Sequence, residues 1–326
     1  SPDGRKVVYT SSFGSEYPWT VPAEARPLAR LQLSSDLHAG ARLDRSGSMT
    51  PLDARSIRAS WAELTAADPN ALQPRSDELL AWHDREALAC KKQGDFAAEL
   101  THLTAALALT PNSANLLERR ANAQAQLKQW DGARRDYEAA ARRGENSLQL
   151  LYNLAVVELA RQRLDDYRDT CERIVDRYQN TDNPPIMNQV AWICAQGPQA
   201  LEDLGPAITL ARKAVDHQAT PYHLNTLGAI LYRAGDFKEA RRLLSTSVSL
   251  HEKATAVSEW AFLGMAEARL GNLAEAQRWA AKIRDRLVED DQLLANDSRF
   301  GSLRYWQERT LFELQRAELE TITQSR

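Results

Sequence analysis

The sequence predicts an all-α protein whose helices pair into about six hairpins and stack as an α-solenoid. The clearest hairpin spans residues 221–250, where two amphipathic stripes flank a break at Gly235-Asp236. The stripe residues are Leu224, Leu227, Gly228 and Leu231 before the break, and Phe237, Ala240, Leu244 and Val248 after it. Because Gly228 has no side chain, the second helix is expected to pack closely against the first.

A fixed spacing of small residues sets the register of the hairpins. Ala87, Ala121 and Ala155 are separated by 34 residues each time, and Trp260-Ala-Phe-Leu-Gly264 repeats the Leu-Gly pattern of the hairpin at 221–250. This period and these residues resemble the tetratricopeptide repeat (TPR). The resemblance is strongest over residues 80–290 and implies a right-handed solenoid that binds a protein segment. A pentatricopeptide-type array, which binds RNA through a basic groove, has a similar period and is the alternative.

Residues 1–20 have a different character, since Pro2-Asp3-Gly4 is a turn signal and a β-prone run follows it. They are similar to a hairpin of a WD-repeat propeller blade, with Trp19 in the place of the Trp of the blade. We interpret them as the remnant of a blade whose propeller lies upstream. The order of the segments resembles the C-terminal arm of bacterial signalling proteins that often carry a serine/threonine kinase domain.

Residues 21–79 are predicted to form a linker and a short helical connector. One helix is expected over residues 28–37 and another from Pro51, because proline suits the first position of a helix. The apolar stripe of the second helix consists of Ile57, Trp61 and Leu64.

The hairpins of residues 80–290 turn at short segments that break helices. These segments are Gly94-Asp95-Phe96, Gln129-Trp130-Asp131, Gln162-Arg163-Leu164, Gly235-Asp236 and Gly271-Asn272-Leu273, whereas the fourth hairpin has a longer turn at residues 196–206. Residues 291–326 are predicted to hold a breaker segment and then a helix over 303–322. This helix is expected to cap the exposed end of the solenoid.

Composition and charge restrict the function. The chain has 326 residues, of which 43% are hydrophobic and 26% charged, and its formal net charge is −3. This charge offers no electrostatic surplus for nucleic acid, and no apolar run approaches the roughly 20 residues that span a bilayer. We therefore expect no nucleic-acid binding and no membrane insertion of this chain. We expect a cytoplasmic location, with any targeting segment upstream.

The sequence shows no motif for catalysis or for a cofactor. His83 and Glu86 lie one helical turn apart, but a carboxylate-bridged metal site needs several such pairs on facing helices. The widely spaced Cys90, Cys171 and Cys194 are interpreted as reduced core thiols. The tryptophans predicted to lie in the core are Trp61, Trp130, Trp260 and Trp306.

The inner face of the solenoid is the predicted binding site, because both apolar stripes of each hairpin are used in packing. An asparagine amide offers a donor and an acceptor to a peptide backbone, and Tyr and Arg side chains add anchoring contacts. The candidate residues are Asn122, Gln126, Tyr152, Asn153, Asn188, Tyr222, Asn225, Tyr232, Arg233 and Arg269. Two alternatives stay open: the asparagines bond neighbouring helices, or the loop at 196–206 is the binding site.

These observations together predict a non-catalytic module for protein interaction or scaffolding, with a protein or peptide as its partner and no cofactor. One alternative is a regulatory arm of a serine/threonine kinase in the same polypeptide. Weaker alternatives are an RNA-binding helical repeat and a structural spacer.

Overall fold

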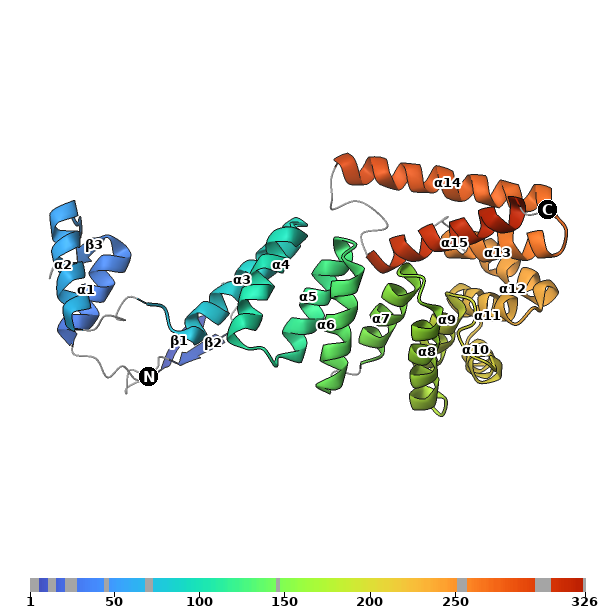
Figure 1. The fold of residues 1–326 in the computed structure, drawn as a ribbon, viewed down its shortest axis with the longest axis horizontal. Coiled ribbons are helices and arrows are strands. Elements are labelled where there is room, and N and C mark those ends of the chain that lie inside the picture. The colour runs from blue at the N-terminus through green and yellow to red at the C-terminus, as the bar shows by residue number, and fades with distance from the viewer. Residues whose placement is uncertain are drawn as a thin grey trace. The chain divides into compact units, whose positions relative to one another are not determined.

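The chain is predominantly α-helical, as the sequence predicts (Figure 1). The computed structural model describes residues 6–10, 16–20, 28–43, 47–67, 73–144, 147–250, 257–296 and 306–324. Contacts divide the chain into two compact units, residues 1–78 and residues 79–326. Within its described part the chain has no helix that combines the length and the apolar character needed to cross a bilayer.

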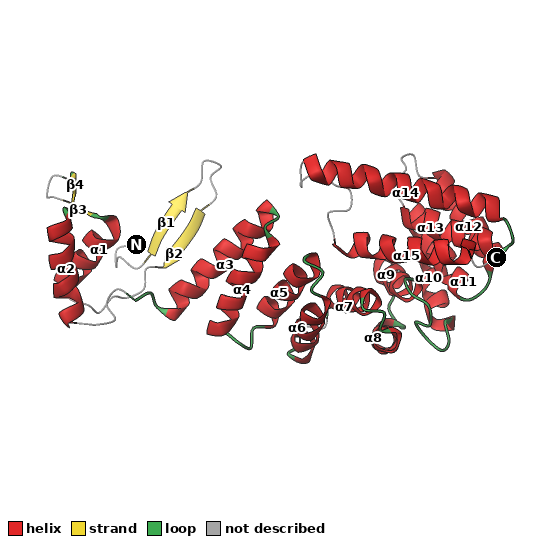
Figure 2. Cartoon of the chain, turned by 45° about the horizontal axis from the view of Figure 1, so that its top comes forward, coloured by secondary structure: helices red, strands yellow, loops and turns green. Residues whose placement is uncertain are grey.

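The first unit contains two β-hairpins and two helices (Figure 2). Strand β1 (Lys6–Thr10) pairs with β2 (Glu16–Thr20) in antiparallel register, and β3 (Ala41–Leu43) pairs with β4 (Met49–Pro51). The helices are α1 (Leu28–Ala39) and α2 (Ala54–Ala67).

Helix α2 differs from the sequence prediction in its start and in its packing. Pro51 ends strand β4, and the helix begins three residues later because the carboxylate of Asp53 accepts a hydrogen bond from the Ser56 backbone N–H at 2.7 Å. The prediction that Trp61 lies in the core is wrong, since 54% of this residue is exposed. The buried face of α2 is carried by Ser60 and Leu64, and Trp61 lies beside that face.

In the described residues of the second unit, twelve helices form six antiparallel hairpins. The hairpins are α3 (Ser76–Gln93) with α4 (Phe96–Leu109), α5 (Ala114–Gln126) with α6 (Trp130–Arg142), α7 (Leu148–Ala160) with α8 (Leu164–Tyr178), α9 (Pro184–Ala195) with α10 (Gly205–His217), α11 (Pro221–Arg233) with α12 (Phe237–Leu250), and α13 (Val257–Arg269) with α14 (Leu273–Asn296). A single buried core runs through the stack from Ala87 to Leu319.

Local sequence signals explain where these helices start and stop. Gly94, Gly235 and Gly271 take positive φ angles of 77°, 86° and 91° at the turns of their hairpins, a region that favours glycine. At the other ends, Ser113 and Ser147 cap α5 and α7 by accepting hydrogen bonds from backbone N–H groups of the first helical turn.

Gly228 allows a close approach of α12 to α11, as the sequence predicts. A Cβ atom at this position would lie 2.6 Å from the Leu244 Cγ atom and 3.3 Å from the Ala240 carbonyl oxygen. Gly264 has a second role, because a Cβ there would meet both Trp279 Cβ of α14 at 3.0 Å and Leu319 Cδ2 at 2.9 Å. Leu319 belongs to the last helix, α15 (Trp306–Gln324).

Candidate functional site

Helix α15 lies along the first helices of successive hairpins. It packs against α13 and α14, which makes it a cap of the last hairpin, and it also runs back to α7 (Figure 1). In a solenoid the first helices line the inner face. The inner face between α7 and α13 is therefore covered by a helix of the same chain.

The N-terminal turn of α15 is bound to α5 and α7 by side-chain amides. Trp306 Nε1 donates to Asn122 Oδ1 at 3.4 Å, and Gln307 Nε2 donates to Asn153 Oδ1 at 2.8 Å. Asn122 Oδ1 also accepts from the Tyr137 hydroxyl at 2.8 Å. These two asparagines thus serve both the helix stack and α15.

The C-terminal half of α15 is held by a buried amide pair and an ion pair. Gln315 Nε2 donates to Gln196 Oε1 at 2.8 Å, and Gln315 is only 1% exposed. Arg233 donates from Nη1 and Nη2 to the two carboxylate oxygens of Glu318 at 2.5 Å and 2.9 Å. The same guanidinium donates to the backbone oxygens of Ala195 and Gln196, so it ties α11, the end of α9 and α15 together.

A cavity of about 820 Å³ opens where α15 begins. It is lined from the solenoid by Lys92, Asn122, Gln126 and Asn153 and from α15 by Trp306, among others. The register places Leu88 of α3 one repeat before Asn122, and Leu88 is 48% exposed. The inner face of the first hairpin is therefore open, whereas the cover by α15 begins at α5.

A second cavity, of about 690 Å³, lies at the long turn of the fourth hairpin. Residues 197–205 form one wall, and Tyr232, Arg233 and Arg269 line the other. Tyr232 is 4% exposed, its hydroxyl is hydrogen-bonded to Arg269, and burial raises the pKa of its phenol. Three of the candidate residues thus belong to this cavity and not to the first.

The remaining candidate residues differ in burial. Asn225 is 8% exposed, and its Oδ1 atom and that of Asn188 are buried without a hydrogen-bond partner. Burial raises the pKa of the Tyr152 phenol, and Glu308 of α15 lies close enough to add to the shift. Tyr222 is 67% exposed. The ten candidates therefore do not form one continuous open site.

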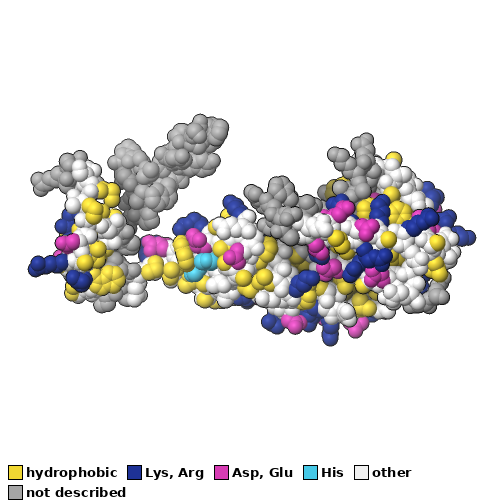
Figure 3. Space-filling view, turned by 90° about the horizontal axis from the view of Figure 1, so that it is seen from above, with side chains coloured by type: hydrophobic (Ala, Val, Ile, Leu, Met, Phe, Trp, Pro, Cys, Tyr) yellow, Lys and Arg dark blue, Asp and Glu magenta, His cyan; other side chains and the backbone are white. Residues whose placement is uncertain are grey.

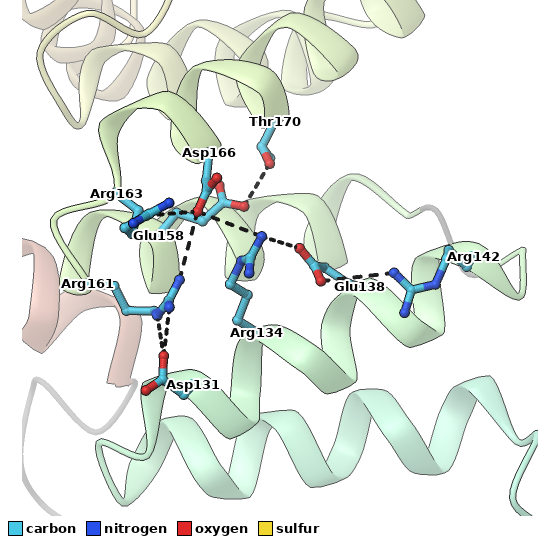
Figure 4. A network of polar contacts seen from close by, with 9 residues as sticks. All are labelled: Asp131, Arg134, Glu138, Arg142, Glu158, Arg161, Arg163, Asp166 and Thr170. Atoms are coloured by element: carbon cyan, nitrogen blue, oxygen red, sulfur yellow. Dashed lines mark hydrogen bonds and ion pairs between the residues drawn. The ribbon is translucent and has the colours of Figure 1, made fainter.

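A polar network joins α6, α7 and α8 outside these two cavities (Figure 4). Arg134 pairs with Glu138 at 2.7 Å and with Asp166 at 3.7 Å. Beneath them Glu158 accepts a hydrogen bond from the Thr170 hydroxyl at 3.1 Å, and burial raises the pKa of Glu158 to about 8. We interpret Glu158 as a structural group that is neutral at pH 7, because it faces neither cavity.

The described residues contain no group of three His, Cys, Asp or Glu side chains that could hold a metal ion. His83 points to His102 of α4, with the two Nδ1 atoms 3.1 Å apart. The cysteines are free: Cys171 and Cys194 are buried in the core, as predicted, whereas Cys90 is half-buried. Trp260 and Trp306 are buried as predicted, and Trp130 is half-buried with its ring centroid 6.0 Å from that of Trp306.

The sequence prediction did not identify the polar residues of α15 as part of the inner face. A signal for them exists, because Gln307, Leu311, Gln315 and Leu319 are spaced four residues apart and share one stripe of the helix. An amide on an otherwise apolar stripe needs a buried hydrogen-bond partner. That partner is an amide at the inner face of the solenoid in both cases.

Comparison with known proteins finds several distantly similar solved structures and one family model. No curated protein matches the chain. A TPR protein from Parabacteroides merdae is 12% identical, with 89% of this chain and 99% of that chain covered and a TM-score of 0.46. YrrB, described as a TPR protein with an unusual peptide-binding site, is 14% identical over 59% of this chain and 92% of its own, with a TM-score of 0.41. PilF of Pseudomonas aeruginosa is 14% identical over 64% and 92%, with a TM-score of 0.42.

The family model of the tetratricopeptide repeat matches two stretches of the sequence, residues 118–181 and residues 201–288. The first stretch covers α6, α7 and α8, and the second covers the helices from α10 to α13 and most of α14. The turn glycines Gly235 and Gly271 and the close contact at Gly228 lie within the second stretch. Residues 118–181 and 201–288 of the second unit therefore carry the sequence pattern of tetratricopeptide repeats.

Proposed function

We propose that this chain is a non-catalytic protein-interaction module whose inner face binds a helical segment of a partner protein. The observation that supports the proposal is the seating of α15, since a helix already lies on this face and is bound through side chains. The surface that holds α15 continues onto α5 and α3, where the cavity of about 820 Å³ remains open. A partner would use this uncovered section.

The side chains of the uncovered section favour a protein partner. Gln126 lines the cavity with an amide that suits a peptide backbone, and Leu88 offers an exposed apolar anchor. Figure 3 shows basic and acidic side chains interspersed over one face of the molecule. Such a surface lacks the continuous basic track that nucleic acid requires. The three free cysteines suit a reducing compartment such as the cytoplasm.

A second proposal is that the chain is a regulatory arm that acts on a kinase domain of the same polypeptide. The antiparallel hairpin of β1 and β2 supports it, because residues 1–20 resemble part of a WD-repeat blade. Under this proposal the chain captures no partner by itself and changes kinase activity only when the two are joined.

Two leucines of similar exposure provide a matched test of the first proposal. Leu88 lies on the uncovered inner face, whereas Leu250, 52% exposed, ends α12. Proteins retained from a lysate by the parent chain would be identified by mass spectrometry, and their affinity for Leu88→Asn and Leu250→Asn would be measured by calorimetry. Burial of a leucine contributes about 1.5–3 kcal/mol, so Leu88→Asn should weaken binding about tenfold or more.

Leu250→Asn should leave the affinity unchanged, and both variants should melt at the temperature of the parent chain. Equal affinities of the two variants for every captured partner would contradict the proposed site. Turnover of a substrate by the isolated chain would contradict the proposal that it is non-catalytic.

A further inference from the structure

Helix α15 is attached to the inner face by polar contacts and by buried apolar side chains along its length, namely Trp306, Leu311, Phe312 and Leu319. The polar contacts reach four first helices or their ends, through Asn122, Asn153, Gln196 and Arg233. At the C-terminal end of α15, Leu319 packs over Gly264 of α13. Buried amides and a half-buried ion pair contribute more to specificity than to the strength of docking, because each must first give up its water.

The match between α15 and the inner face is incomplete. The Oε1 atoms of Gln307 and Gln315 and the Nε atom of Arg316 are buried without a hydrogen-bond partner. A buried polar atom without a partner costs free energy that a better-matched helix would not lose. The inner face therefore accepts α15 without being optimal for it.

We propose that α15 is an exchangeable occupant of the inner face, and that the partner of this face is an amphipathic helix with the side-chain pattern of α15. The proposal rests on the proposed function and names the partner class. The pattern consists of Trp, Gln, Leu, Gln, Glu and Leu at the positions of Trp306, Gln307, Leu311, Gln315, Glu318 and Leu319. A partner helix that repeats these contacts and also satisfies its own glutamine oxygens, which have no partner in α15, displaces α15 and binds between α7 and α13.

In this arrangement α15 inhibits the binding of other helices to the inner face of its own chain. Because α15 belongs to the same chain, its effective concentration at the inner face is high, and a helix in solution must compete with it. Only a helix that leaves fewer buried polar groups without a hydrogen bond than α15 does can displace it. Chains with a weakened α15 consequently bind such a helix more tightly than the parent chain does.

A charge reversal on α15 leaves every residue of the solenoid intact and tests this exchange. In the full chain, Glu318→Lys places a cation against Arg233, whose side chain is 6% exposed. A fluorescent synthetic peptide of residues 306–324 would be titrated with this variant and followed by anisotropy. The matched control is Glu320→Lys, because Glu320 faces Arg284 of α14 at 3.8 Å and not the inner face.

The peptide should bind the Glu318→Lys chain at least about tenfold more tightly than it binds the parent or the Glu320→Lys chain. The same peptide carrying Glu318→Lys should not bind. Hydrogen exchange on the parent chain provides a readout that needs no variant: the amides of α15 should exchange faster than those of α11 and α13 while the solenoid stays protected.

Exchange of α15 and α13 at one common rate would overturn the proposal, whatever the peptide does. Absence of peptide binding to a folded Glu318→Lys chain would overturn it too. Neither result touches the proposed function, which is tested at Leu88 on the uncovered section. Loss of the Leu88 effect with intact peptide exchange would instead restrict the partner to the face between α7 and α13.

Discussion

The close contact of α11 and α12 can be tested by adding a single methyl group. In Gly228→Ala the new Cβ would lie 2.6 Å from Leu244 Cγ and 3.3 Å from the Ala240 carbonyl oxygen. Leu244 is fully buried and the carbonyl is backbone, so α12 itself must shift. Overpacking of this kind costs about 1–3 kcal/mol, while alanine gains about 1 kcal/mol over glycine in a helix. We expect a net loss of up to about 2 kcal/mol.

Gly132→Ala is the matched control, because this glycine also lies inside a helix. Its Cβ would meet the Oε1 atom of Gln124 at 2.6 Å, which is the end of a flexible side chain that can move away. The gain in helix propensity offsets the loss of the 3.2 Å hydrogen bond from Gln124 to Asp136, so the net change should stay within about 0.5 kcal/mol.

Urea unfolding followed by circular dichroism would compare the two variants with the parent chain. The stability of a solenoid is distributed over neighbouring repeats, so hydrogen exchange should place the loss in Gly228→Ala at α11 and α12. Equal stabilities of the two alanine variants would refute the argument that steric contact requires glycine at position 228.

Two further predictions concern buried polar groups. Burial raises the pKa of Glu158 from 4.5 to about 8, so the stability that this group contributes is fully present below pH 4.5 and is lost as the pH rises through 8. Between these two values the free energy of unfolding should fall by about 1.4 kcal/mol per pH unit. Urea titrations from pH 5 to pH 8.5 should show a flatter slope for Glu158→Gln than for the parent chain. Tyr167→Phe should cost about 1–3 kcal/mol by urea unfolding, because its hydroxyl donates to the Ile193 carbonyl at 2.6 Å and accepts from the Gly197 N–H at 3.1 Å. The control is Tyr137→Phe, which removes a half-buried hydrogen bond between the Tyr137 hydroxyl and the Asn122 side chain. A smaller loss of stability in Tyr167→Phe than in Tyr137→Phe would contradict the prediction.

The hairpins could be predicted from the sequence because their determinants are local. A stripe of apolar residues, a turn glycine such as Gly235 and a small residue such as Ala121 act within one repeat or on the next one. Trp61 shows the limit of this reasoning, since its spacing fits an apolar stripe while the buried face of α2 is centred on Leu64. Periodicity identifies a face to within about one residue, and packing decides which neighbour is covered.

The position of α15 could not be predicted, because its partners are distant in sequence. Trp306 and Asn122 are separated by 184 residues, and Gln315 and Gln196 by 119. The apolar stripe of α15 shows that the helix packs on something, and a cap on the last hairpin would satisfy it as well. The inner face is selected because Gln307 and Gln315 form hydrogen bonds with the side-chain amides of Asn153 and Gln196, which belong to different repeats.

Equivalent positions in successive repeats differ according to whether α15 covers them. Leu88 and Asn122 are one period apart on α3 and α5. Asn122 receives a hydrogen bond from α15, whereas Leu88 lies beyond its end and stays half exposed. An amide is suitable where a buried polar partner is present, and an exposed leucine gains free energy only when another surface covers it. The change from amide to leucine between these two helices therefore coincides with the end of the covered section, which is the section that the proposed function assigns to a partner protein.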